Sequence, residues 1–162
     1  MPEVVCNTSP LQYLHQIGQL RILPALAGSI IVPISVQAEL DAGIAKGLDL
    51  PKIENLNWIQ IRAPISVKAA SLITDLGPGE SQVLMLALET PGSIALLDDG
   101  LARRVAIARG IPIKGTLGLL LDAKRAGHIT VVKPSLDKLQ DLGFRLAEPT
   151  RAAVLKLAGE SS

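Results

Sequence analysis

The amino-acid sequence predicts an α/β fold in a single domain, with a mainly parallel sheet covered by helices on both faces. The 162 residues correspond to one domain and are enough to bury a substantial core. Hydrophobic residues make up 48% of the chain and charged residues only 19%, which excludes a disordered chain. Short runs rich in valine and isoleucine alternate with stretches of helical periodicity, and this alternation is typical of a parallel sheet.

Five short apolar runs predict the strands of the sheet. They are Glu3–Asn7, Ser29–Pro33, Trp58–Ala63, Ser93–Asp99 and Ile111–Gly115. The third run alternates between apolar and polar residues, so it is expected at an edge of the sheet.

Stretches with helical spacing lie between and after these runs, and most of them end at glycine. They are Ser9–Gly18, Leu20–Ala27, Ile34–Gly47, Gly79–Glu89, Gly100–Gly110, Thr116–Ala126, Ser135–Asp141 and Pro149–Ala158. We expect residues 1–145 to form the main domain, and residues 146–162 to add a helix that packs on it or extends it. The ending Gly159-Glu160-Ser161-Ser162 is expected to fray.

The composition narrows the kind of site that the chain can build. Cys6 is the single cysteine, which excludes an internal disulfide and a zinc site made of thiolates. With only two histidines as well, a metal would be held by oxygen ligands, which indicates Mg²⁺ or Mn²⁺. The sequence lacks a run of roughly 18 apolar residues and the pattern of a signal peptide, so a cytoplasmic protein is expected.

Charge is distributed unevenly along the chain, although the net charge is only +1. Residues 1–99 carry five lysines and arginines against ten aspartates and glutamates, whereas residues 100–162 carry eleven against five. An acidic half can gather carboxylates around a cation, and a basic half can attract phosphate groups. Basic side chains that only solvate exposed helix faces would give the same numbers.

Polar residues collect where the predicted strands end, and in an open parallel sheet the carboxyl ends of the strands form the functional edge. These residues are Asn7, Thr8 and Ser9 after the first strand, Asp98 and Asp99 after the fourth, and Lys114 and Thr116 at the fifth. Because side chains alternate along a strand, only one of the two adjacent aspartates is expected to face the site. Asp98 is expected to point away.

Each candidate also has an ordinary structural interpretation. The two aspartates could be turn and cap residues, and Asn7 could cap the next helix. Glu39 could be a solvated helix residue, and Glu80 a first-turn acid that the helix dipole favours. Their arrangement favours a shared role, because Glu39, Glu80 and Asp99 all lie on elements that the sheet brings to one edge, where a hard cation needs several oxygens.

Other chemistries have less support. No glycine-rich phosphate motif follows the first strand, and three aromatic residues in the whole chain predict no platform for stacking bases. Binding of nucleic acid would depend on charge, and the candidates are Arg103, Arg104, Arg109, Lys114, Lys124 and Arg125. Arg103 could equally form an ion pair with Asp99, four residues earlier. A phosphoacceptor receiver domain would use similar residue types, but its acid pair follows the first strand and not the fourth.

Several short segments resemble the PIN domains, and within them the branch of the VapC-type toxin nucleases. The matching segments are Val4-Val5-Cys6-Asn7-Thr8-Ser9-Pro10-Leu11, Val36-Gln37-Ala38-Glu39-Leu40, Gly77-Pro78-Gly79-Glu80-Ser81, Leu96-Leu97-Asp98-Asp99 and Ile111-Pro112-Ile113-Lys114-Gly115-Thr116-Leu117-Gly118. Their order and spacing carry the resemblance, which spans residues 3 to 145. It implies a doubly wound α/β fold and the hydrolysis of RNA phosphodiesters by an endoribonuclease that uses Mg²⁺ or Mn²⁺.

The resemblance also implies roles for individual residues. Catalysis and metal binding would fall to Asn7, Glu39, Glu80 and Asp99, with Asp98 as a further ligand and Thr8, Ser9 and Thr116 in support. In the toxin setting a small antitoxin would cover the groove. The high apolar content favours a homodimer or a surface patch that the antitoxin covers.

One residue departs from the family pattern. Asn7 stands where the family usually has aspartate, which removes a negative charge but keeps a carbonyl oxygen. The alternative is therefore a catalytically weak or inactive module that binds nucleic acid or protein.

Overall fold

The computed structural model describes residues 2–65 and 76–160 and confirms the α/β fold. Its five strands are β1 (Val4–Cys6), β2 (Ile30–Pro33), β3 (Ile59–Arg62), β4 (Ile94–Leu96) and β5 (Ile113–Lys114). They form one sheet in the order β3-β2-β1-β4-β5, and every pairing is parallel. All five predicted strands are present, and β3 lies at an edge as its alternating sequence predicts.

The eight predicted helices are also found within the described residues, with ends shifted by a few positions. They are α1 (Thr8–Gln16), α2 (Ile22–Ala27), α3 (Ile34–Ala45), α5 (Pro78–Glu89), α6 (Gly100–Ala108), α7 (Thr116–Arg125), α8 (Lys133–Asp141) and α9 (Glu148–Leu157). A short 3-10 helix, η1 (Ile53–Asn55), was not predicted. In this part of the chain no helix is long and apolar enough to cross a bilayer.

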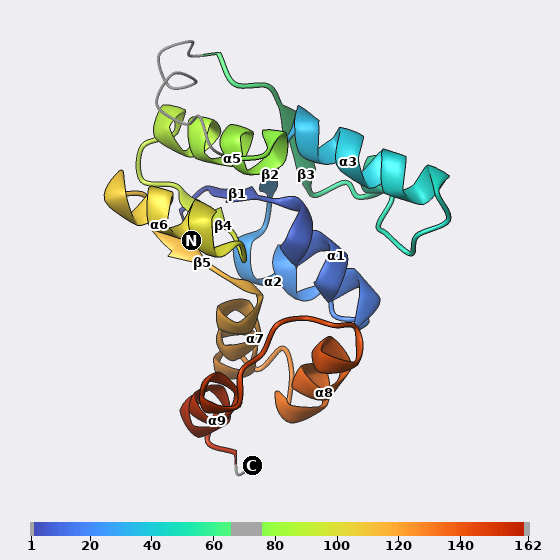
Figure 1. Cartoon of the computed structure of the whole chain (residues 1–162), viewed down its shortest axis with the longest axis vertical. Helices are drawn as coiled ribbons and strands as arrows, with labels where there is room; N and C mark the ends of the chain where they lie inside the picture. Colours follow the sequence, from blue (N-terminus) through green and yellow to red (C-terminus); the bar gives the residue numbers. More distant parts are fainter. Residues whose placement is uncertain (1, 66–75, 161–162) are drawn as a thin grey trace.

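The central strands are buried on both faces, which explains their continuous apolar sequences. Val5, Val32 and Ala95 are fully buried. Helix α5 packs against β1, β2 and β4, whereas α2 contacts β2 and α7. In Figure 1 helix α5 lies at one end of the molecule, and α7, α8 and α9 gather at the other.

The strand order reverses between β1 and β4, and this reversal places the functional edge. Strands β2 and β3 follow β1 on one side, and β4 and β5 lie on the other. In doubly wound sheets, ligands bind in the crevice beyond the carboxyl ends of the strands at such a switch point. Here the backbone N–H of Asn7 donates to the carbonyl of Leu96 at 3.1 Å, so the residues that follow β1 and β4 start side by side.

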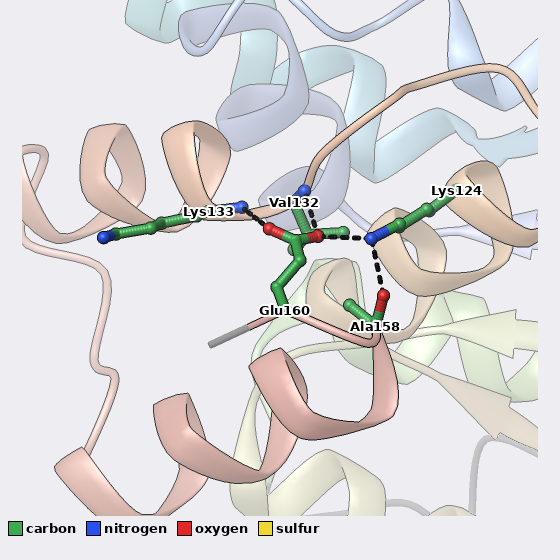
Figure 2. A network of polar contacts seen from close by, with 5 residues as sticks. All are labelled: Lys124, Val132, Lys133, Ala158 and Glu160. Atoms are coloured by element: carbon green, nitrogen blue, oxygen red, sulfur yellow. Dashed lines mark hydrogen bonds and ion pairs between the residues drawn. The ribbon is translucent and has the colours of Figure 1, made fainter. Parts of the chain in front are cut away.

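The carboxyl end of the chain is fixed as far as Glu160, so the prediction that it frays is wrong for Gly159 and Glu160. The Glu160 carboxylate accepts hydrogen bonds from the backbone N–H groups of Val132 (2.7 Å) and Lys133 (3.1 Å) and from Lys124 Nζ (2.8 Å) (Figure 2). Lys124 Nζ also donates to the carbonyl of Ala158 at 2.5 Å. These contacts join α9 to α7 and to the start of α8. Ser161 and Ser162 lie outside the described residues.

The environment of Glu160 favours its charged form. Burial of the carboxylate acts to raise its pKa, but the hydrogen bonds from Lys124, Val132 and Lys133 and the charge of Lys124 outweigh it. The pKa of Glu160 is therefore lowered from the ordinary value of 4.5.

Candidate functional site

Two adjoining cavities lie at the carboxyl ends of β1, β4 and β5. The first, which we call the acidic cavity, has a volume of about 330 Å³ and is lined by Asn7, Ser9, Tyr13, Glu80, Asp98, Asp99, Phe144 and Arg145. The second, the basic cavity, has a volume of about 400 Å³ and is lined by Asp98, Arg103, Ile113, Lys114, Gly115, Leu117, Gly118, Phe144 and Arg145. Asp98, Phe144 and Arg145 line both. The sheet therefore places carboxylates and cationic side chains in neighbouring parts of one crevice.

Asn7 carries a buried oxygen without a partner. The residue occupies the N-cap position of α1, but its side chain makes no cap hydrogen bond. Its side-chain oxygen Oδ1 is buried and accepts no hydrogen bond, and the whole residue is 3% exposed. A buried carbonyl oxygen without a partner costs free energy. A cation at this point would supply the missing interaction.

Glu39 directs a second oxygen to the same place. A Cβ atom on Gly79 would lie 2.7 Å from Glu39 Oε1 and 3.0 Å from Asn7 Oδ1. Both oxygens therefore face the first turn of α5, which approaches them closely because residue 79 is glycine. The other carboxylate oxygen, Glu39 Oε2, accepts a hydrogen bond from Thr8 Oγ1 at 2.6 Å. Thr8 thus orients Glu39.

Glu80 lies half-buried in the first turn of α5 and lines the acidic cavity. Its carboxylate folds back over the start of its own helix, with Oε2 only 2.9 Å from the position of a Cβ on Gly77. The helix dipole stabilises a negative charge there. Glu80 therefore combines a structural role at the helix end with a place in the cavity wall.

Both aspartates after β4 line the acidic cavity. Asp99 caps α6, because its Oδ2 accepts a hydrogen bond from the N–H of Ala102 at 2.9 Å. The half-buried Asp98 is held at two points by Thr116, through the N–H to Oδ1 at 2.8 Å and through Oγ1 to Oδ2 at 2.6 Å.

The expectation that Asp98 points away from the site is therefore wrong. Side-chain alternation holds only within a strand, and β4 ends at Leu96, two residues before Asp98. The backbone turns beyond that point. Both members of the pair consequently reach the same crevice.

Cys6 is close to this site but cannot act as a nucleophile. Its side chain is fully buried. Burial raises the pKa of its thiol, and the charge of Asp98 raises it further. The thiol therefore stays protonated at neutral pH.

The oxygen donors fit a hard divalent cation that binds few protein ligands and keeps several of its waters. Among the described residues, no three His, Cys, Asp or Glu side chains are grouped closely enough to hold an ion together. Mg²⁺ binds through one or two carboxylates and keeps several of its waters. The orphaned Asn7 Oδ1 beside Glu39 Oε1, with Glu80 and Asp99 in the adjoining cavity wall, matches that requirement.

The basic residues that the sequence singles out differ in their surroundings. Arg103 lines the basic cavity and donates from Nη1 to the carbonyl of Leu97 at 2.9 Å. The ion pair with Asp99 is not among those that the described residues form. Lys114 lines the same cavity but is paired with Asp122. Arg104 is exposed on α6 and belongs to the lining of neither cavity.

Three further residues of the crevice were not predicted: Tyr13, Phe144 and Arg145. The rings of Tyr13 and Phe144 meet edge to face, with centroids 4.9 Å apart and planes at 89°. The scarcity of aromatic residues predicted no such platform. Tyr13 is in α1 and Phe144 is in the loop after α8, so no local pattern linked them; only the tertiary fold brings this loop against α1.

Comparison with known proteins gives one finding about the family. A family model described as a PIN domain matches residues 3–160, which is nearly the whole chain. A search of curated proteins found no match to the chain.

Proposed function

The chain belongs to the PIN-domain family, a nuclease-type fold, and from this premise we propose that it is a metal-dependent endoribonuclease that hydrolyses RNA phosphodiesters. The observation that carries the proposal is the buried, unpartnered Oδ1 of Asn7, which faces the same space as Glu39 Oε1 at the first turn of α5. A buried amide oxygen beside an exposed carboxylate oxygen suits a hard cation. It lies at the switch point of the sheet, where such folds bind their ligands.

In the proposed mechanism, Asn7 and Glu39 would hold Mg²⁺ or Mn²⁺, with Glu80, Asp99 and Asp98 in the adjoining cavity wall. When bound, the cation supplies Lewis-acid chemistry at the scissile phosphate. The chain's own contribution is to fix the carboxylates before substrate arrives. Thr8 holds Glu39 and Thr116 holds Asp98, so little reorganisation is needed during the reaction.

The basic cavity beside the carboxylates supports binding of the RNA backbone. Arg103 and Lys114 line it, and Arg104 adds positive charge on the same helix as Arg103. Cationic side chains attract phosphates without reading sequence. Because Lys114 shares its charge with Asp122, we expect Arg103 to contribute more than Lys114.

The test is cleavage of a mixed RNA pool by the purified protein with Mn²⁺ and with EDTA. Asp98→Asn and Asp99→Asn should each abolish a cleavage that depends on the metal. The matched control is Asp141→Asn, since Asp141 is exposed at the end of α8 and outside both cavities. Cleavage that persists in EDTA, or in both site variants, would contradict the proposal.

The second candidate is a binding module that has lost most of its activity. It is favoured by Asn7, which replaces a charged ligand with a neutral one. Calorimetry with Mn²⁺ on the natural chain and on Asn7→Asp separates the two candidates. Weak heat from the natural chain, strong heat from Asn7→Asp and cleavage only by the variant would support the binding module.

We also propose a biological setting, a cytoplasmic toxin whose small antitoxin covers the crevice, and a homodimer as its assembled state. Exposed apolar side chains support an interface: Ile107 is 65% exposed on α6, and Leu157 is 62% exposed on α9. Sedimentation at micromolar concentration tests the dimer, and a monomer there would contradict it.

A further inference from the structure

We propose that Tyr13, Phe144 and Arg145 form a nucleotide subsite between the acidic and basic cavities, where an unpaired base of single-stranded RNA stacks on the aromatic pair and an adjacent phosphate meets Arg145. This inference rests on the proposed nuclease function of the same crevice. It adds a site for one nucleotide, made by residues that the proposed mechanism does not use.

The loop after α8 lies where the two cavities meet. Phe144 and Arg145 are lining residues of both cavities, so they lie at the junction between the carboxylates and the basic wall. A base held there would place its phosphate within the crevice. The C-terminal half of the chain thus contributes directly to the site.

The loop is fixed in place. Gly143 has a φ of 87°, a backbone conformation that favours glycine, and it ends α8 with a turn. The N–H of Phe144 then donates to the carbonyl of Leu139 at 3.0 Å. Beyond it, Leu146 is buried and its carbonyl accepts from Gln140 Nε2 at 3.3 Å. A segment anchored on both sides presents Phe144 and Arg145 without a large entropic cost on binding.

The aromatic pair offers a surface for a base. Tyr13 and Phe144 are both half-buried, and their edge-to-face contact holds the two rings at right angles. Bases stack on such rings regardless of sequence. In a duplex the base faces are covered by their neighbours, so only an unpaired base can use this surface.

Arg145 supplies a charge that the protein does not use elsewhere. Within residues 2–65 and 76–160 it has no ion-pair or hydrogen-bond partner, and it is exposed. Lys114, in contrast, is paired with Asp122, and Arg151 with Asp137. An arginine beside a stacked base can engage the phosphate with two parallel hydrogen bonds.

The experiment measures binding without cleavage, by fluorescence anisotropy of a labelled single-stranded RNA 12-mer in EDTA. A second 12-mer, with abasic sites at its central positions, lacks the stacking groups. Phe144→Leu removes the ring but keeps an apolar side chain, and Phe144→Tyr restores the ring. Arg145→Gln removes one charge, and its matched control is Lys156→Gln, an exposed residue in the last turn of α9 that lines neither cavity.

We expect Phe144→Leu to weaken binding of the intact RNA roughly tenfold and to leave binding of the abasic RNA unchanged. Phe144→Tyr should bind the intact RNA as tightly as the natural chain does. Arg145→Gln should lower the salt dependence of binding by about one unit of slope, and Lys156→Gln by less. Equal binding of intact and abasic RNA by the natural chain would overturn the proposal, as would tighter binding of an acidic peptide than of RNA.

The outcomes also separate this proposal from the proposed function. If RNA binding depends on Phe144 but no cleavage occurs in Mn²⁺, the subsite is supported and the nuclease function is refuted. If the natural chain cleaves RNA in Mn²⁺ but Phe144→Leu and Arg145→Gln bind RNA as tightly as it does, the nuclease function is supported and the subsite is refuted.

Discussion

Replacing Glu160 by glutamine should destabilise the whole domain, although the residue is close to the end of the chain. Its side chain is only 12% exposed, and it accepts hydrogen bonds from Lys124, Val132 and Lys133. Glutamine keeps the size but loses the charge, and its amide NH₂ group faces donors. One of the three donors at least then loses its acceptor.

The size of the effect follows from these contacts. Hydrogen bonds to charged groups contribute about 1.5–3 kcal/mol each, and an anion at a helix N-terminus adds about 0.3–1 kcal/mol. Lys124 keeps one partner, the carbonyl of Ala158, which limits the loss. Because such contributions are not additive, we expect the free energy of unfolding to fall by about 2–3 kcal/mol at pH 7.

The effect should depend on pH in one direction. The pKa of Glu160 is lower in the folded chain than its ordinary value of 4.5. Its contribution to stability is therefore complete above that value and is lost as the pH falls through the folded pKa. The natural chain and Glu160→Gln should differ at pH 7 and converge in acid.

Urea unfolding from pH 7 down to a pH below the folded pKa of Glu160 measures the difference in free energy of unfolding between the two chains, taken from the transition midpoints at constant slope. The matched control is Glu148→Gln, on the same helix but exposed, for which we expect a loss of about 0.5 kcal/mol. The reasoning is refuted if Glu160→Gln costs no more than this control, or if its cost is unchanged in acid.

Three further predictions concern the crevice. Gly79→Ala should weaken Mn²⁺ binding at least tenfold by calorimetry, because the new Cβ would meet Glu39 Oε1 at 2.7 Å; Gly100→Ala, whose Cβ would meet only Arg104 at 3.5 Å, should leave Mn²⁺ binding unchanged. Thr116→Val removes the hydroxyl bonded to Asp98, so it should lower the free energy of unfolding in urea by about 1–2 kcal/mol and slow RNA cleavage. Thr116→Ser keeps a hydroxyl and should recover both stability and cleavage. Equal behaviour of the two variants would contradict this. Cys6 should react with a thiol reagent at pH 8 only after unfolding, because burial raises its pKa; rapid labelling of the folded chain would disprove it.

Local patterns in the sequence were enough to predict the elements of the fold. Runs of apolar residues marked β1, β2 and β4 because both faces of these strands are buried, and glycines marked the ends of most helices. The alternating residues of β3 placed it at the edge of the sheet. Each of these signals depends on neighbours along the chain.

The sequence could not predict contacts that depend on tertiary structure. The meeting of Tyr13 and Phe144, and the bonds from Glu160 to Lys124 and Val132, join segments far apart along the chain. The direction of Asp98 was mispredicted because the strand ends earlier than its apolar run suggests. The roles of the candidate metal ligands stay predictions.

Helix α7 is attached at both ends to distant parts of the molecule. Thr116 in its first turn holds Asp98, and Lys124 in its last turn holds Glu160. A helix of this length measures about 15 Å, so the crevice and the chain end share one rigid element. Truncation of the chain after Gly159 would therefore loosen α7 from its carboxyl end, and amide hydrogen exchange would speed up there before it did at Thr116.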